Sequence, residues 1–530
     1  MDKRWILVAM AVLMTLGTWC TRESHADDAR KSAVNRQRRI IFNNDGDDAW
    51  LTGAPATPEG FLSVRMDHIG DCGVDSVFYC TTQGINIFTQ DSDLTEVFLA
   101  DYGGFANNRM AQLIEQGTDP VKLAVQACRQ RGIEIIWTMR MNDIHDNWTA
   151  AFFSKWKNEH PQFLMGTSAD KAKYPESDPR CVYSFADFAH PEVRDLTVEV
   201  IKDVLERYDV DGIDMDFLRH QCYFKETRLH EPVTSEHLDM LTDMVAKVRA
   251  VVLAASKKKD KPILLTARVF PTLALNRHFG FDVDQWVTKG YVDFIAVGGG
   301  YDPFTMPAKN MIDRGHAWGI PVYLCTSASG MVQRGVNHSV LSGGSTEAWR
   351  ATAANAWYAG ADGIMTFNLF PELPGSDATK NARAAWAEMS DPQALVGKDK
   401  LYCIENLDYS RTLGYMIRSV PWEGRLPVVV AKGASVDRIL PVADDIPALT
   451  NRIKTLRLRI CLAGLEAADQ VAVSINGTAL AAQPEKPLWL AADVPPTAMS
   501  QGANTLTVRY DSGAADALTM QSVELQVQYE

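Results

Sequence analysis

Eight short apolar runs recur along the chain up to Phe367, and each is followed by polar residues and then, in most cases, by a helical pattern. The runs are Arg39–Phe42, Ser76–Tyr79, Ile133–Trp137, Gly212–Asp216, Ile263–Thr266, Val292–Val297, Pro321–Cys325 and Gly363–Phe367. Apolar runs of this length that alternate with amphipathic helices indicate parallel strands. Eight is the strand count of a closed barrel. We therefore predict an α/β fold with a (β/α)8 TIM barrel over residues 37–395.

Helical spacing of apolar residues is clearest in four segments: Pro120–Arg131, Val193–Tyr208, Leu238–Ala255 and Trp349–Tyr358. Two connections, Thr81–Thr118 and Met141–Tyr183, are longer than a barrel needs. Both follow the carboxyl end of a predicted strand, where barrel enzymes keep their active sites, so we expect them to wall a cleft. The second contains Trp148, Phe152, Phe153 and Trp156, which suit either sugar stacking or the buried face of a short helix. We favour burial for at least two of them.

The pattern changes near Gly397–Tyr402. Beyond this point short alternating runs appear, broken by turns such as Asn476-Gly477; they are Leu456–Ile460, Gln470–Ile475, Asn504–Tyr510 and Val523–Tyr529. Alternation with frequent turns predicts an antiparallel β-sandwich over residues 400–530. We expect this domain to stabilise the barrel. A sugar-binding module is the alternative, and it would need exposed aromatic side chains from among Trp422, Trp489 and Tyr510.

The N-terminus has the features of a secretory signal peptide. Lys3 and Arg4 precede an apolar run, and Ser24-His25-Ala26 provides small residues at a cleavage site. We predict a signal peptide over residues 1–26, cleavage after Ala26, and a secreted or periplasmic protein. Cys20 raises the alternative of a lipid anchor, which the bulky Trp19 before it disfavours. No later stretch approaches the roughly 18 apolar residues of a membrane span.

Composition limits the remaining possibilities. The chain has 530 residues, of which 46% are hydrophobic, so it should hold a large core and more than one domain. The net charge of −13 is spread along the chain, which makes nucleic acid a poor partner. The eight cysteines after Cys20 form no CxxC or zinc-type spacing. A disulfide between Cys72 and Cys80, or between Cys181 and Cys222, is conceivable in an oxidising compartment.

Two carboxylates at the end of one buried strand are the most informative feature. Asp214 and Asp216 lie two residues apart in the run from Asp211 to Phe217, so both point to the same face of the strand. Two buried like charges require a metal, a cationic partner or a chemical task. The structural alternative is that one Asp caps the following turn and the other pairs with Arg219 or Arg268.

Further polar residues follow the other predicted strands and should meet at the same end of the barrel. They are Asp45, Asp47 and Asp48, Asn142, Asp143 and His145, Arg219 and His220, Arg268, Tyr301 and Asp302, and Asn368 and Glu372. The acidic group Asp45, Asp47 and Asp48 resembles a hard-cation cluster, although loop capping suits its spacing better. A ring of carboxylates, arginines and amides suits the recognition and cleavage of a neutral, hydroxyl-rich molecule such as a sugar.

Two motifs resemble the family-10-like glycosyl hydrolases, a family of glycosyl-hydrolase-like TIM barrels. Phe188-Ala-His-Pro-Glu-Val-Arg-Asp195 opens a helix, and Asp211-Gly-Ile-Asp-Met-Asp216 ends the next strand. The resemblance covers roughly Arg38 to Asp391 and implies a glycoside hydrolase that needs no cofactor. It also implies that Asp216 is the nucleophile of a retaining mechanism. Asp214 is the fallback, and it replaces the His or Arg often found at this position in related amylase-type barrels.

A second carboxyl group must protonate the leaving oxygen. It lies about 5 to 5.5 Å from the nucleophile in retaining enzymes and about 6.5 to 9.5 Å away in inverting ones. The candidates are Asp302, Glu372 and Asp143. We favour Asp302, because its strand lies two positions around the barrel from that of Asp216. An ordinary Asp-Pro turn with Pro303 is the alternative.

We therefore predict a secreted glycoside hydrolase that acts on an oligosaccharide or polysaccharide. The expected substrate-binding residues are Asn142, Asp143, Arg219, His220, Arg268, Tyr301 and Asn368. Two alternatives remain open. A carbohydrate-binding barrel without catalysis would lack the second carboxyl at the right distance, and a metal-dependent hydrolase would gather Asp45, Asp143, Asp214 and His145 around one ion.

Overall fold

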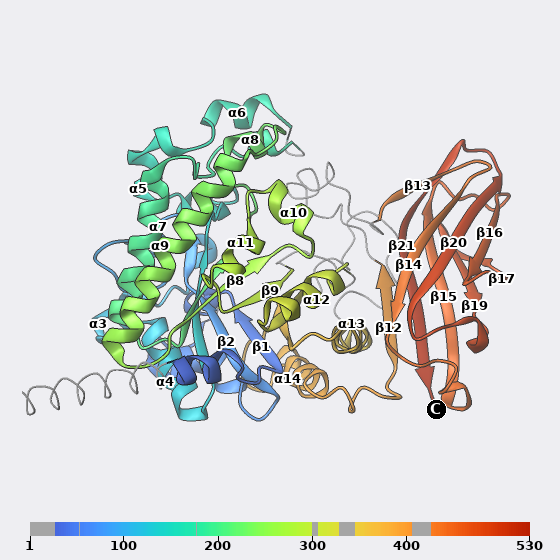
Figure 1. Cartoon of the computed structure of the whole chain (residues 1–530), viewed down its shortest axis with the longest axis horizontal. Coiled ribbons are helices and arrows are strands. Elements are labelled where there is room, and N and C mark those ends of the chain that lie inside the picture. The colour runs from blue at the N-terminus through green and yellow to red at the C-terminus, as the bar shows by residue number, and fades with distance from the viewer. Residues whose placement is uncertain (1–26, 52, 176–177, 299–305, 328–344, 405–425) are drawn as a thin grey trace, which may run out of the picture.

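The chain forms a closed parallel barrel followed by two antiparallel sheets (Figure 1). The structure is a computed structural model that describes residues 27–530 except 52, 176–177, 299–305, 328–344 and 405–425. This architecture confirms the predicted fold class of a TIM barrel with a C-terminal antiparallel domain. The expected signal peptide, Tyr301, Asp302 and Trp422 all lie outside the described residues.

Each of the eight predicted strands is present in the barrel. They are β1 (Ile40–Asn44), β2 (Val74–Cys80), β6 (Glu134–Arg140), β7 (Gly212–Asp216), β8 (Leu264–Val269), β9 (Phe294–Val297), β10 (Val322–Ser327) and β11 (Gly363–Phe367). Their order around the barrel follows the sequence, and β1 closes it by pairing with both β2 and β11. Closure leaves no exposed strand edge and brings all the carboxyl ends to one mouth.

Helices cover the outside of the barrel. They are α2 (Pro58–Leu62), α3 (Met110–Glu115), α4 (Pro120–Arg131), α5 (Lys155–Glu159), α6 (Ser168–Lys173), α7 (Pro191–Arg207), α8 (Lys225–Arg228), α9 (Ser235–Lys259), α10 (Leu273–His278), α11 (Val283–Thr288), α12 (Lys309–Trp318), α13 (Thr346–Ala359) and α14 (Asp377–Met389). The four predicted helices correspond to α4, α7, α9 and α13. In α7, Pro191 occupies the first turn, where its missing N–H costs no hydrogen bond, and Val193, Val200 and Val204 are buried.

The two long connections have structure that the sequence did not predict. The connection after β2 contains a small sheet of β3 (Thr82–Gly84), β4 (Ile87–Phe88) and β5 (Glu96–Val97). Strands of two or three residues are too short to give a readable alternation. Phe98, Phe105 and Phe152 from the two connections pack into a separate aromatic cluster, with ring centroids 4.9–5.1 Å apart. The connections therefore brace one another.

The C-terminal domain consists of two sheets that share one hydrophobic core. One sheet contains β12 (Lys400–Ile404), β13 (Val428–Ala431), β15 (Ile453–Ala463), β18 (Gln483–Lys486), β19 (Trp489–Asp493) and β21 (Ala517–Tyr529). The other contains β14 (Ser435–Val442), β16 (Gln470–Ile475), β17 (Thr478–Leu480) and β20 (Gly502–Ser512). Trp489 and Tyr510, two of the three aromatics considered for sugar binding, are buried in this domain and cannot present a ring face to a sugar.

The domain packs on the barrel through α13 (Figure 1). Ala351 of this helix is buried in the core of the C-terminal sheets, and Asn355 donates from Nδ2 to the Pro441 carbonyl at 3.1 Å. Arg350 donates to the Asp399 carbonyl just before β12. These contacts attach the domain to the barrel, and its expected stabilising role stays a prediction.

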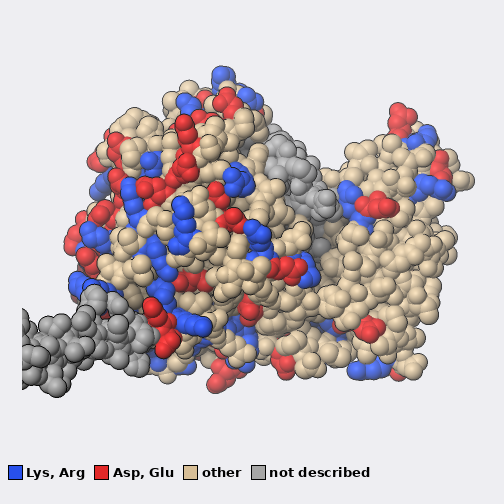
Figure 2. Space-filling view, in the orientation of Figure 1, with Lys and Arg blue, Asp and Glu red and all other residues tan. Residues whose placement is uncertain are grey.

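The surface and the cysteines bear on two further expectations. Lysine and arginine are interspersed with aspartate and glutamate over the barrel helices in Figure 2, and the C-terminal sheets present a large uncharged area on the same face. None of the helices in the described part of the chain combines the length and hydrophobicity needed to cross a bilayer. All eight cysteines after Cys20 are buried thiols, so neither conceivable disulfide is formed.

The floor of the barrel is closed by a buried ion pair. Arg38 donates from Nε and Nη2 to Glu134 at 2.6 and 2.7 Å, and its guanidinium lies 4.6 Å from the centroid of the Phe294 ring. Ser76 donates a further bond to Glu134 at 2.8 Å. Because Arg38 is fully buried, each charge depends on the other for compensation.

We expect Arg38→Met to lower the free energy of unfolding by about 3–5 kcal/mol, because it leaves Glu134 charged, buried and without its ionic partner. The double variant Arg38→Met/Glu134→Gln should recover part of this loss. Urea unfolding of both variants and the wild type measures the difference. A single variant within about 1 kcal/mol of the wild type would show that the barrel does not need this pair.

Candidate active site

Strand register places three charged residues in one row at the mouth of the barrel. Asp216 on β7 is level with Arg140 on β6 and with Arg268 on β8. One layer deeper, Asp214 is level with Thr138 and Thr266. Residues level with one another on neighbouring parallel strands point to the same side of the sheet. The row thus surrounds one central carboxylate with two guanidinium groups.

Asp214 is the deeper and more constrained carboxylate. It is fully buried, and its Oδ2 accepts hydrogen bonds from Arg268 Nε at 3.0 Å, Arg268 Nη2 at 2.8 Å and Thr138 Oγ1 at 3.0 Å. Burial raises the pKa of Asp214 to about 6; the Arg268 charge opposes the rise and the Asp216 charge adds to it. Asp214 therefore anchors the arginine beneath the mouth.

Asp216 lies above this pair and is also nearly buried, with 2% of its surface exposed. Its Oδ1 accepts the backbone N–H groups of Leu218 and Arg219, both at 3.0 Å, and its Oδ2 lies 3.4 Å from Arg268 Nη1. Both parts of the structural alternative are therefore present: Asp216 caps the turn after β7, and Asp214 pairs with Arg268. The same contacts fix the orientation of the Asp216 carboxylate and stabilise its negative charge.

A second charged network continues around the mouth from Arg140. Asp45 lies 2.9 Å from Arg140 Nη2 and 4.0 Å from Arg219 Nη2, and it accepts a bond from Asn43 Nδ2 at 3.0 Å. Burial favours a higher pKa for Asp45, but the guanidinium groups of Arg140 and Arg219 outweigh it and hold the pKa well below its usual range. The loop-capping role expected for Asp45 is thus corrected: it belongs to the mouth.

The close approach of the Asp45 loop to β2 requires glycine at position 46. Gly46 has a φ of 72°, and a Cβ there would meet the Cys80 carbonyl oxygen at 1.9 Å. Asp47 and Asp48 point elsewhere: Asp47 pairs with Arg65, and Asp48 accepts the Tyr79 hydroxyl at 2.8 Å. The three acidic residues therefore do not converge on one cation.

His145 links the two sides of the second network. Its Nδ1 lies 2.7 Å from Asp143, and its Nε2 lies 2.9 Å from Arg219 Nη2. Because an arginine only donates, Nε2 accepts and the ring proton is on Nδ1, facing Asp143. Burial and the Arg219 charge lower the pKa of His145 against the pull of Asp143, which keeps the ring neutral.

The second network also contains the residues that could bind a metal ion. Asp143, His145 and His220 could each offer a ligand atom within 4.8 Å of the others. However, both ring nitrogens of His145 are already engaged by Asp143 and Arg219, and His220 Nδ1 accepts the Ile144 N–H at 3.3 Å. Asp214 belongs to the Arg268 pair instead. Of the four ligands considered from the sequence, Asp143 and His145 contact each other, whereas Asp45 pairs with Arg140 and Asp214 with Arg268.

The remaining candidates have different environments. Asn142 is buried, and its amide donates to the carbonyls of Ala186 and Cys222 and accepts the Ala186 N–H. Both N–H groups of the Asn142 side-chain amide are engaged, so this residue connects the segments of Ala186 and Cys222. This finding corrects its expected role in sugar binding. Glu372 is exposed in the loop after β11. Asn368 follows β11 directly with a φ of 56°.

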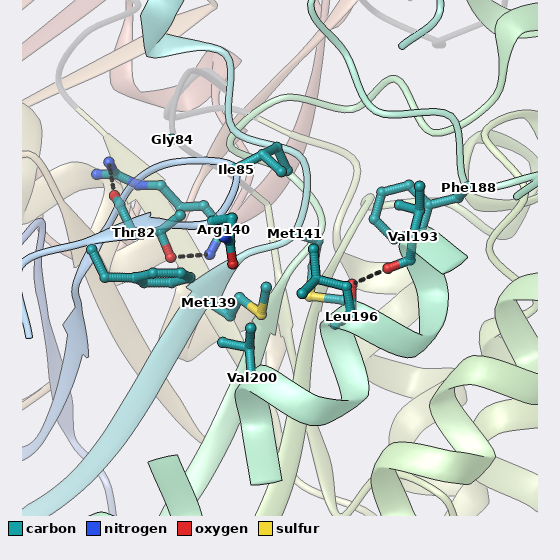
Figure 3. Close-up of a pocket in the computed structure, with 13 residues that line it drawn as sticks. Thr82, Gly84, Ile85, Met139, Arg140, Met141, Phe188, Val193, Leu196 and Val200 are labelled. Atoms are coloured by element: carbon teal, nitrogen blue, oxygen red, sulfur yellow. Dashed lines mark hydrogen bonds between the residues drawn. The ribbon is translucent and has the colours of Figure 1, made fainter. Parts of the chain in front are cut away.

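The cavity shown in Figure 3 is not a substrate site. It lies behind β6, where Met139 and Met141 face Leu196 and Val200 of α7, and it has a volume of about 10 Å³. A space this small holds at most about one water molecule. Figure 3 also shows the Arg140 guanidinium turned away from this gap, toward Thr82. The cavity is a small packing gap between β6 and α7.

Part of the chain is similar to one known family. Residues 98–318 match the family described as Glycosyl hydrolase-like 10. The match contains the motifs that end in Asp195 and Asp216 and confirms the resemblance over that segment, which is shorter than the expected Arg38 to Asp391. No curated protein matches the chain.

Several solved structures are similar at low identity. Alpha-L-fucosidase isoenzyme 2 from Paenibacillus thiaminolyticus is 14% identical, with a TM-score of 0.44 over 69% of this chain and 51% of that one. A cycloisomaltooligosaccharide glucanotransferase from Paenibacillus sp. is 10% identical, with a TM-score of 0.34 over 92% and 57%. The PgaB (BpsB) glycoside hydrolase domain from Bordetella bronchiseptica is 11% identical, with a TM-score of 0.45 over 67% and 98%. This chain thus spans little more than half of the first two structures, and these likenesses assign no substrate.

Asp214→Asn is expected to remove a pH dependence from the stability of the protein. The folded pKa of about 6 lies above the roughly 3.9 of an unfolded aspartate. The contribution of Asp214 is therefore fully present below about pH 4 and is lost as the pH rises through about 6. Unfolding free energies of wild type and variant should be measured near pH 4.5 and pH 7.5. The advantage of the wild type should shrink by on the order of 1–3 kcal/mol, and an unchanged difference would contradict the assignment.

Proposed function

We propose that the protein is an exported glycoside hydrolase that cleaves O-glycosidic bonds of an oligosaccharide or polysaccharide by a retaining mechanism, with Asp216 as the nucleophile. The proposal rests most directly on the position of Asp216 at the carboxyl end of β7, between Arg140 and Arg268. The match of residues 98–318 to a glycosyl-hydrolase-like family supports the same class. Export rests on the predicted signal peptide, and the mature chain would begin at Asp27.

The contacts of Asp216 suit attack on an anomeric carbon. Two backbone N–H groups hold Oδ1, and Arg268 lies beside Oδ2, so the carboxylate cannot rotate freely. A fixed carboxylate avoids the entropic cost of orienting the nucleophile, and its charge stabilises the oxocarbenium-like transition state. Attack forms a glycosyl ester on Asp216 as the leaving oxygen takes a proton. Water then hydrolyses the ester, and the proton returns to the acid/base residue.

The proton donor must be a carboxyl group other than those bound to cations. The pKa of Asp45 and the pKa of Asp143 are both lowered despite burial, by Arg140 and Arg219 around Asp45 and by His145 and His220 around Asp143. Carboxylates held ionised in this way are poor general acids. We therefore retain Asp302, which follows β9 along the chain, as the acid/base residue and Glu372, after β11, as the alternative. β9 lies two strands from β7 in the barrel order.

We expect Asp216→Asn to abolish turnover while the fold is retained. The amide keeps the shape and can still accept the two backbone N–H groups, but it loses the nucleophilic charge, so kcat/KM should fall by at least on the order of 10²–10⁴-fold. Release of aryl alcohols and reducing sugars from a panel of α- and β-glycosides and polysaccharides first identifies a substrate. The variants are then compared on that substrate.

Asp239→Asn on the exposed side of α9 provides a matched control for this experiment, because it makes the same change away from the mouth. It should leave turnover unchanged. Near-normal turnover in Asp216→Asn would contradict the nucleophile assignment, and inactivity confined to Asp214→Asn would move the role one layer deeper. Binding of sugars by the wild type without any turnover would favour a carbohydrate-binding barrel, and loss of activity on chelation would favour a metal-dependent hydrolase.

A further inference from the structure

Trp148 differs from the other tryptophans that the structure describes. Its side chain is 67% exposed, whereas each of the others is buried or half-buried. It follows the short turn His145–Asn147 after β6, and its backbone N–H donates to the His145 carbonyl at 3.0 Å. Exposure of an indole to water is unfavourable, so a fixed and exposed tryptophan beside a charged site calls for a ligand or a partner.

The indole of Trp148 is held against the second charged network. Its ring meets the His145 ring edge to face, with centroids 4.7 Å apart and an interplanar angle of 76°. His145 also contacts Arg219, through Nε2, and the backbone N–H of Arg219 donates to Asp216. His145 therefore contacts both Trp148 and Arg219, and Arg219 contacts Asp216, the proposed nucleophile. Trp148 is at the rim of the same mouth.

The other aromatic residues of this connection do not offer a comparable ring. Phe152 is buried in the aromatic cluster and supports His145 from 6.2 Å. Trp156 is stacked on Phe163, with centroids 6.0 Å apart and an interplanar angle of 25°. Four aromatic residues of this connection suit either sugar stacking or burial in the sequence. In the structure Phe152 and Trp156 pack inward, and Trp148 faces solvent.

We propose that Trp148 forms a carbohydrate subsite at the rim of the mouth, where its indole stacks on the apolar face of a pyranose ring that is not the ring being cleaved. This proposal rests on the proposed function and extends it. The C–H face of a pyranose provides apolar area for the indole, and its hydroxyl groups can bond to the polar side chains beside it. Such a subsite selects for chains longer than a single sugar.

The test uses Asp216→Asn as the parent protein, because it should bind sugars without cleaving them. Titration calorimetry is carried out with soluble malto-, cello-, galacto- and chito-oligosaccharides of about three to six units. For the oligosaccharides that the parent binds, adding Trp148→Ala should weaken binding by about 10-fold or more. Trp148→Phe, which keeps an aromatic face, should restore part of the affinity. Tyr358→Ala, which removes another exposed aromatic ring on α13, should have no effect.

A second readout distinguishes a subsite from a structural role. In the protein with Asp216 intact, Trp148→Ala should raise KM for the long substrate by a similar factor, with kcat and the turnover of an aryl monosaccharide unchanged. Equal affinity of parent and Trp148→Ala would overturn the subsite and leave the proposed function in place. Absence of binding to every oligosaccharide, together with absence of turnover in the wild type, would overturn both. Equal losses on short and long substrates would also overturn the subsite.

Discussion

The mouth of the barrel depends on one buried guanidinium that serves two carboxylates. Arg268 binds Asp214 through Nε and Nη2 and directs Nη1 toward Asp216. Two like charges on one face of a strand would repel each other strongly in an interior of low polarity. The shared cation makes this arrangement stable, and it does so without neutralising either carboxylate completely. Burial still raises the pKa of Asp214 to about 6, and the Asp216 charge adds a smaller contribution.

The two aspartates look equivalent in the sequence, but they have different roles in this arrangement. Asp214 is bound by a threonine and an arginine and lies one layer below the mouth, so it positions Arg268. Asp216 is one layer higher on the same strand, level with Arg140 and Arg268. The second network of Asp45, Arg140, Asp143, His145 and Arg219 balances the charge around it with ion pairs. Of the acid candidates considered from the sequence, Asp302 and Glu372, which follow β9 and β11 along the chain, remain.

The strands and the aspartate pair could be predicted from the sequence because both are local properties. The residues of a run such as Gly212–Asp216 are enough to predict a buried strand. Arg268 follows another such run, so it could be expected at the same end of the barrel. The pairing of Asp45 with Arg140 could not be predicted, because it depends on the strand order, in which β1 and β6 both pair with β2. The prediction that Asn142 binds sugar was wrong for a related reason, because its hydrogen-bond partners, Ala186 and Cys222, lie about 40 and 80 residues away along the chain. Composition alone could not decide which of four nearby aromatics faces solvent.

The central claim, that Asp216 carries the covalent intermediate, is tested most directly by trapping that intermediate. Once the sugar specificity is known, the matching 2-deoxy-2-fluoroglycosyl fluoride should inactivate the protein. The 2-fluorine slows both formation and hydrolysis of the glycosyl ester, and the good fluoride leaving group keeps formation faster than hydrolysis, so the ester accumulates. Peptide mass mapping then locates the added sugar. The account predicts one sugar per chain, on the peptide that contains Asp216 and on that side chain. A label on Asp214, Asp302 or Glu372, or full turnover with no trapped ester, would contradict it.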